Sequence, residues 1–268
     1  MNNKQKGFTL IELLVVIAII ALLLSIILPS MKKAKEYAHK VVCQSNTRQL
    51  GAVYGMYTND NNGFFPPSSQ DPDVLPDGAG TWFLVLRPYY EDPATLLCPA
   101  SKPAPDPLPG YLNNRWQWDI QWWPTVFPTQ IRDPETSEIR GSYGQNWWLT
   151  SSDSEFPTTY ADGNKFKRIS NTPSPSSVPV VGDCGAFLVR PTESSSPPPN
   201  DGDYKYAAGD EMRRVCTNRH NSGGVNWVFA DFSVQHLRLK QLWKTRWHKN
   251  WQRREIITWP EWMQPLPE

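Results

Sequence analysis

The chain has 268 residues, with 27 basic and 26 acidic side chains and a formal net charge of +1. This length allows one ordinary domain with a substantial core, and the near-neutral charge excludes strong nonspecific attraction to nucleic acid or acidic lipid. The 26 prolines and 13 tryptophans are high counts. So many prolines favour a loop-rich body of short elements over a helical bundle.

The first predicted element is a membrane-spanning helix. Residues Phe8 to Leu28 are almost all Leu, Ile, Val or Ala, and as a helix they would extend about 32 Å, close to the thickness of a bilayer's hydrocarbon core. Lys4 and Lys6 precede this run and place its start on the cytoplasmic side. A cleaved secretory signal would have a shorter apolar core and a small-residue cleavage site, whereas the charged residues PSMKKAKEYAHK follow here.

One carboxylate, Glu12, lies inside this apolar run. An ionised side chain within a membrane helix is costly and usually has a nearby partner. Cleavage between Gly7 and Phe8 would create an amino group on Phe8, one helical turn from Glu12 or near Glu12 of a neighbouring subunit. We therefore predict that Glu12 neutralises this amino group and sets the register between subunits.

The residues Lys6-Gly7-Phe8-Thr9-Leu10-Ile11-Glu12 resemble the class III signal of type IV pilins and type II secretion pseudopilins. The resemblance implies that prepilin peptidase cuts after Gly7, that Phe8 becomes N-methylated, and that Glu12 acts in assembly. It also implies other pilin-like subunits, an assembly platform protein and an ATPase as partners. The protein would span the bacterial inner membrane once, with a cytoplasmic N-terminus and a periplasmic or extracellular head, before it enters a filament.

The helix is predicted to continue beyond the membrane as an amphipathic segment. Pro29 would kink or soften it, and Asn59–Gly63 is a strong turn signal that would end it. Residues at helical spacing would form its packing face: Ala34, Ala38, Val41 or Val42, Ser45, Leu50, Val53 and Tyr57. The predicted domains are a leader peptide (1–7), a transmembrane assembly helix (8–28), the amphipathic half of the helix (29–62), a globular head (63–234) and a basic, Trp-rich C-terminal segment (235–268).

The head is predicted to be built from short strands and loops. Candidate strands or short helices are Thr81–Leu86, Val178–Val181, Phe187–Val189, Val225–Phe229 and Phe232–Leu237, and Ala230-Asp231 would form a tight hairpin turn. Predicted loops are Ser101–Pro109, Asn171–Pro179 and Pro191–Asp203. The predicted fold class is α+β, with a long N-terminal helix packed on a small, loop-rich antiparallel β head.

Five segments resemble a prepilin-like family abundant in Planctomycetes, Lentisphaerae and their relatives: Cys43–Gly51, Tyr57–Pro66, Trp82–Pro99, Ser142–Trp147 and Arg219–Asp231. That family ends in a processing-associated domain named for a His, nine residues and Asp-Gly. Here ten residues separate His220 from Asp231, and Phe232 replaces the glycine. We therefore expect Arg219 and His220 to be structural residues hydrogen-bonded to a neighbouring loop, with a ligand-binding or processing role as the alternative.

Four cysteines are present, and they show neither CxxC spacing nor histidines at zinc-binding spacing. A zinc knuckle is therefore not expected. If the head is exported, two disulfides are allowed and three pairings are open. We predict Cys43–Cys98 and Cys184–Cys216, with four buried thiols as the alternative.

No catalytic or nucleotide-binding motif is found in the sequence. We therefore expect neither enzymatic activity nor a cofactor. Ca²⁺ has two weak candidate stretches, Asn59–Asn62 and the more favoured Asn200–Asp203, in which Asp201 and Asp203 would be ligands. A plain turn is the competing interpretation of both stretches.

The C-terminal stretch Gln235–Arg254 is basic and aromatic. Leu239, Trp243, Trp247 and Trp251 recur every four residues, which would place them on one face of a helix. We predict a packing face covered by Lys and Arg stems. Binding of single-stranded nucleic acid is the less favoured alternative.

Together these features predict a structural subunit of a type II secretion pseudopilus or a type IV pilus-like filament. The alternative function is a filament-borne adhesin or minor pilin that binds glycan or DNA. Aromatic residues that could stack on sugar rings are Tyr111, Trp116, Trp118, Trp122 and Trp123.

Overall fold

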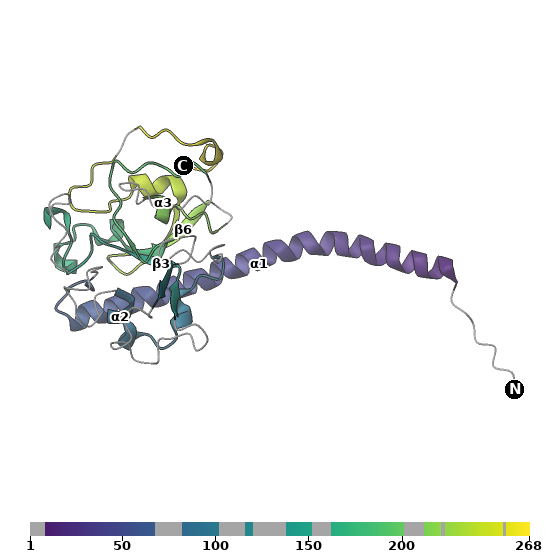
Figure 1. Cartoon of the computed structure of the whole chain (residues 1–268), viewed down its shortest axis with the longest axis horizontal. Coiled ribbons are helices and arrows are strands. Elements are labelled where there is room, and N and C mark those ends of the chain that lie inside the picture. Colours follow the sequence, from purple (N-terminus) through teal and green to yellow (C-terminus); the bar gives the residue numbers. More distant parts are fainter. Residues whose placement is uncertain are drawn as a thin grey trace.

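The computed structural model describes residues 9–67, 82–101, 116–119, 138–151, 162–200, 212–220, 223–253 and 256–268. A single helix, α1 (Leu10–Asp60, 51 residues), extends out of the head and curves gently (Figure 1). It would be about 76 Å long. The helix ends at Asn61, and the positive φ angles of Asn62 (52°) and Gly63 (78°) turn the chain away. The predicted turn at Asn59–Gly63 is therefore confirmed.

Helix α1 continues through Pro29. Proline has no N–H, so the carbonyl of Ser25 lacks its usual helical donor. Two neighbouring serines bond back to the helix: Ser25 Oγ donates to the Leu22 carbonyl at 2.6 Å, and Ser30 Oγ donates to the Ile27 carbonyl at 2.8 Å. The helix stays continuous through the proline, although neither serine bonds the Ser25 carbonyl.

The buried face of α1 begins at Cys43. Its members are Cys43, Thr47, Leu50, Gly51, Val53, Tyr54 and Thr58. Leu50 and Val53 were correctly predicted to be buried, and Tyr57 is half-buried. The N-terminal part of the predicted face is wrong, because Ala34, Ala38, Val41 and Ser45 are exposed. Helical spacing predicted which residues share a face of the helix. It could not show how far along α1 the head extends.

A five-stranded sheet forms the centre of the head, in the order β5-β3-β4-β6-β7. Its strands are β3 (Tyr143–Asn146), β4 (Pro179–Asp183), β5 (Leu188–Val189), β6 (Gly224–Phe229) and β7 (Val234–Arg238). All neighbours are antiparallel except the β3–β5 pair, which is parallel. The predicted antiparallel head is therefore correct except at this edge. A separate antiparallel pair joins β1 (Trp116–Asp119) to β2 (Glu138–Gly141).

Strands β6 and β7 form the predicted hairpin, and α1 crosses it. The turn is longer than the predicted Ala230-Asp231, because β6 ends at Phe229 and β7 begins at Val234. The Phe229 amide donates to the Ser233 carbonyl at 2.8 Å across the turn. Phe232 adopts a φ of 62°, a left-handed conformation in which glycine is favoured. A Cβ at Gly51 would lie 3.0 Å from the Phe232 carbonyl oxygen, and one at Gly55 would touch the Phe232 ring. Small residues therefore let α1 lie close to this turn.

Short helices connect the strands. The α-helical ones are α2 (Trp82–Val85) and α3 (Met212–Val215), so the predicted Thr81–Leu86 segment is helical in its described part. Single turns of 3₁₀ helix are η1 (Arg87–Tyr89), η2 (Pro93–Leu96), η5 (Asp162–Asn164), η6 (Ile169–Asn171), η7 (Pro175–Ser177), η8 (Leu239–Lys244) and η9 (Glu261–Met263).

The Trp-rich C-terminal segment packs against the head. Trp243 and Trp247 are fully buried, and the Trp247 ring lies edge-on to Trp227 of β6 with ring centroids 5.0 Å apart. The predicted packing role is thus confirmed. The predicted helix is wrong beyond Lys244, where η8 ends and the chain is irregular. Trp243 Nε1 donates to the Ser195 carbonyl at 2.8 Å, so tertiary contacts, not helical periodicity, place these rings.

Candidate assembly helix and its anchor in the head

The first half of α1 is exposed from Leu10 to Lys35. Its apolar side chains are highly exposed; Leu10 is 79% exposed and Leu28 is 63% exposed. In water such a surface would be strongly unfavourable, so it requires lipid or other protein around it. Among the described residues, this helix is long and apolar enough to cross a membrane.

Glu12 lies in the first turn of α1 and forms a capping box with Thr9. Its carboxylate Oε2 accepts hydrogen bonds from the Thr9 amide and from Thr9 Oγ1, both at 2.8 Å. The Glu12 amide in turn donates to Thr9 Oγ1 at 3.3 Å. These bonds pair two orphan donors at the helix start. The acid in the apolar run therefore has a local partner within its own subunit.

Several predicted site residues lie outside the described part of the chain. These are Lys6, Gly7 and Phe8 of the processing site and Asp201 and Asp203 of the weak Ca²⁺ loop. Of the aromatic residues considered for sugar binding, Tyr111, Trp122 and Trp123 also lie outside it, as do the side chains of Trp116 and Trp118. Their predicted roles stay predictions.

A disulfide attaches the second half of α1 to the head. Cys43, the first buried residue of the helix, is bonded to Cys98, which follows η2, and their Cα atoms are 5.1 Å apart. Asn46, one turn further along α1, donates to the Leu97 carbonyl at 2.8 Å. The predicted Cys43–Cys98 pairing is confirmed.

The second predicted disulfide is not formed. Cys184, after β4, and Cys216, after α3, are both buried thiols. The Cys184 sulfur accepts a hydrogen bond from the Ala186 amide at 3.4 Å. The predicted Cys184–Cys216 pairing is therefore wrong, because sequence proximity and an even cysteine count do not determine whether two sulfur atoms meet.

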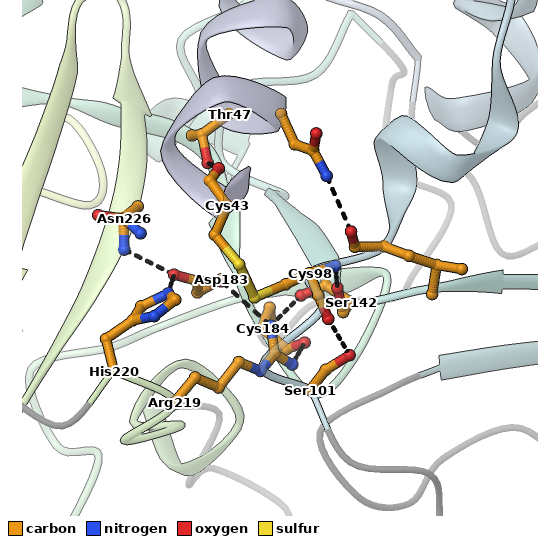
Figure 2. Close-up of polar contacts among 12 residues, drawn as sticks. Cys43, Thr47, Cys98, Ser101, Ser142, Asp183, Cys184, Arg219, His220 and Asn226 are labelled. Carbon is orange, nitrogen blue, oxygen red and sulfur yellow. Dashed lines mark hydrogen bonds and ion pairs between the residues drawn. A yellow bond between two sulfur atoms is a disulfide. The ribbon is translucent and has the colours of Figure 1, made fainter. Parts of the chain in front are cut away.

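A buried ion cluster lies beside the disulfide (Figure 2). Asp183, at the end of β4, is fully buried, and its Oδ1 lies 3.3 Å from Arg219 Nη1. Its Oδ2 lies 3.2 Å from His220 Nε2 and accepts the Asn226 amide at 2.7 Å. Burial alone would raise the pKa of Asp183, but His220, Arg219 and the Asn226 amide outweigh it and lower that pKa.

Arg219 joins three segments of the head through this cluster. Its guanidinium donates to the Ser142 carbonyl before β3 and to the Cys184 carbonyl after β4. These contacts confirm that Arg219 and His220 are hydrogen-bonded to neighbouring segments. Removing one partner of such a buried pair leaves an uncompensated charge, which is strongly destabilising.

His220 and Asp231, the two ends of the degenerate His-Asp motif, make separate contacts. His220 binds Asp183 ahead of β6, whereas Asp231 lies past the far end of β6 and is exposed. There Asp231 Oδ1 accepts hydrogen bonds from the Ser233 amide at 3.0 Å and from Ser233 Oγ at 2.6 Å. In this chain the motif therefore marks the two ends of one strand and does not form a joint site.

A second histidine, His236 of β7, borders the cluster. Its Nδ1 lies 3.0 Å from Asn226 Oδ1, and its ring centroid is 6.5 Å from that of His220. Burial, followed by the positive charges of Lys40 and His220, lowers the pKa of His236 to about 4. Near pH 7 this imidazole is therefore neutral.

Sequence reasoning missed the roles of two of these residues, Thr9 and Asp183. Thr9 could have been found, because Thr-x-x-Glu ahead of an apolar run is the signature of a capping box. Asp183 gave no such signal: it is 36 residues from Arg219 and 43 from Asn226, and only the pairing of β4 with β6 brings them together.

Comparisons with known proteins match this arrangement at the N-terminus. The family described as the prokaryotic N-terminal methylation motif matches residues 2–28. The chain is 40% identical over 74 residues to type II secretion system core protein G of Escherichia coli K12, covering 28% of this chain and 50% of that protein. It is 37% identical over 122 residues to core protein G of Pectobacterium carotovorum, covering 44% and 66%.

A pilus protein is matched as well. The type IV wide pilus major component PilA4 of Thermus thermophilus is 42% identical over 62 residues, covering 23% of this chain and 47% of that protein. The chain thus spans about half to two thirds of the length of these relatives, and no solved structure matches it. Residues 2–28 accordingly match the prokaryotic N-terminal methylation motif, and the N-terminal part of the chain is similar to a type II secretion core protein and to a type IV pilus component.

Proposed function

We propose that the chain is a structural subunit of a type II secretion pseudopilus or a type IV pilus-like filament. The observation that carries this proposal is the exposed, mostly apolar half of α1, which overlaps the N-terminal methylation motif. A helix with this surface has no partner in its own head and needs lipid before assembly and other subunits after it. Relatives named as core protein G and PilA4 support the same role.

In the proposed pathway, prepilin peptidase cuts after Gly7 and methylates Phe8. Lys4 and Lys6 keep the start of the chain in the cytoplasm, so that the head folds on the other side. A platform protein and an ATPase then move the subunit into the filament. The Phe8 amino group would meet Glu12 of an adjacent subunit, whose carboxylate would exchange its bonds to Thr9 for this new partner.

Mass spectrometry of the N-terminus of the full chain, made in a host with prepilin peptidase, tests the proposal. We expect a mature protein that begins with N-methylated Phe8. Gly7→Val serves as the matched variant. Its leader should remain uncleaved, so that the protein begins at Met1 or at the residue after it. An intact leader on the unmodified chain in that host would contradict the proposal.

Assembly needs its own measurement, because processing alone does not show a filament. Cells expressing the chain with its secretion or pilus system are sheared, and the sheared fraction is probed for the head. We expect the processed chain in this fraction and the Gly7→Val variant in the membrane. Processed protein that stays wholly in the membrane of a system-positive host would contradict the filament role.

A further inference from the structure

Three groups that bind soft metal ions meet where α1 enters the head. Cys43 comes from α1, Cys98 from the segment after η2, and His220 from the segment before β6. Their ligand atoms lie within 4.8 Å of one another, and all three residues are buried. Figure 2 shows the two sulfur atoms and the histidine grouped around Asp183.

The histidine already has the supporting partner that a metal ligand needs. Histidines that bind a metal through one ring nitrogen commonly donate the other to a carboxylate, which fixes the ring and raises its basicity. Asp183 Oδ2 lies 3.2 Å from His220 Nε2 and is itself held by the Asn226 amide at 2.7 Å. Arg219 binds the other carboxylate oxygen and fixes its orientation.

In the oxidised head the two sulfur atoms are bonded to each other and supply no thiolate. We propose that the reduced head binds one Zn²⁺ through Cys43, Cys98 and His220, with Asp183 as the supporting carboxylate. A dithiol reductant would donate two electrons and two protons to the disulfide and would itself become a disulfide. Zn²⁺ would then displace to solvent the two thiol protons and any proton on the His220 nitrogen that ligates it.

Geometry and charge both favour this ion. From ordinary Zn–S and Zn–N bond lengths, the ligand atoms of a tetrahedral site lie about 3.6–3.8 Å apart. After the S–S bond is broken, the two sulfur atoms would separate and the three groups, now within 4.8 Å of one another, would adjust to this spacing. Two thiolates neutralise Zn²⁺, and Asp183 is already paired with Arg219, so the metal adds no net charge to the buried site. Sulfur and imidazole ligands do not select Ca²⁺ or Mg²⁺.

The consequence is that α1 remains tied to the head in both redox states. The disulfide links Cys43 to Cys98 after oxidation, and zinc would link the same residues before it. A newly made subunit would thus have its head joined to α1 before any oxidant reaches it, with both thiols protected as zinc ligands.

A cobalt titration of the full chain in detergent micelles tests the site. The chain is reduced with a phosphine, and Co²⁺ is added while thiolate-to-cobalt and tetrahedral ligand-field absorption are recorded. We expect one Co²⁺ per chain, displaced by Zn²⁺. The oxidised chain should show none of this absorption, and His220→Gln in the reduced chain should weaken the affinity at least about tenfold.

The other two cysteines provide the matched control. Cys184→Ser/Cys216→Ser keeps the proposed ligands and should bind Co²⁺ as the unmodified chain does, whereas Cys43→Ser/Cys98→Ser should not. Binding that persists in Cys43→Ser/Cys98→Ser or disappears in Cys184→Ser/Cys216→Ser would overturn the proposal. So would a reduced chain that neither binds Co²⁺ nor gains thermal stability from Zn²⁺, whether circular dichroism shows it folded or unfolded.

Discussion

The two halves of α1 belong to one continuous helix but face different surroundings. From Leu10 to Lys35 its side chains are exposed and mostly apolar around the whole circumference; from Cys43 to Thr58 one face is buried against the head and the other is exposed. A helix that is apolar all round is stabilised by lipid or by partners outside the chain. A helix with one apolar face packs that face against the chain's own core. The junction at Cys43 is where the disulfide lies.

The comparison predicts that a change in the first half affects assembly and leaves the fold of the head intact. Glu12→Ala should insert and be processed, while filament yield in the sheared fraction falls at least about tenfold, the equivalent of about 1.4 kcal/mol per subunit contact. The reason is the loss of the only carboxylate described in the apolar segment. Head stability, measured by tryptophan fluorescence, should not change.

Two control variants separate assembly from helix capping. Thr9→Val removes the capping hydroxyl but keeps the Glu12 carboxylate, and Glu36→Gln changes an acid on the same helix outside the apolar run. Both should assemble. If Thr9→Val fails as Glu12→Ala does, the acid serves the capping box; normal yield from Glu12→Ala would refute its role in register.

The same Leu→Ala substitution should affect the stability of the head in one half of α1 and not in the other. Leu50 is fully buried and Leu14 is 58% exposed. Leu50→Ala should lower the free energy of unfolding of the head by about 2–5 kcal/mol, because it leaves a cavity, whereas Leu14→Ala should leave it unchanged. Denaturant unfolding in micelles, followed by the buried tryptophans, measures both; equal losses would disprove the division of α1.

Removing the disulfide should loosen the junction between the halves. With a chelator present, Cys43→Ala or chemical reduction should cost about 2–4 kcal/mol of unfolding free energy, because the bond closes a loop between residues 55 apart. Val41→Ala, at an exposed position nearby, should be neutral. The Cys43→Ala/Cys98→Ala chain should no longer respond to reductant, and a continued response would point to the other thiols.

The smallest expected effect is a pH dependence of the stability of the head, caused by His236. Because the pKa of His236 is lowered to about 4 in the folded head, the unfolded chain binds more protons between about pH 6.5 and 4. Stability should therefore fall as pH falls through this window, by about 1 kcal/mol after allowing for solvent screening.

Two variants assign that slope to its source. His236→Gln should flatten the slope. Lys40→Met, which removes a positive charge from α1, should raise the folded-state pKa of His236, narrow the pH window from its acid side and reduce the loss of stability. Denaturant unfolding across the pH range gives the slope directly. An unaltered slope in His236→Gln would assign it to other titrating groups.

Much of the chain's local structure could be predicted from residues close together in sequence. The apolar run, the turn after Asp60 and the β6–β7 hairpin were all predicted, because each depends on backbone preference or periodicity within a few residues. The Trp stripe illustrates the limit. Its burial was predicted correctly, but its helix was not, because the rings are positioned by carbonyls such as that of Ser195.

By itself, then, the sequence determined that the first half of α1 is suited neither to water nor to a one-sided core, since it is an almost unbroken apolar run. Only the tertiary structure decided that Cys43 pairs with Cys98 while Cys184 and Cys216 remain thiols, and that Asp183 is the partner of both Arg219 and His220. These contacts join residues tens of positions apart, and their geometry depends on how α1 and the sheet pack, which no local pattern encodes.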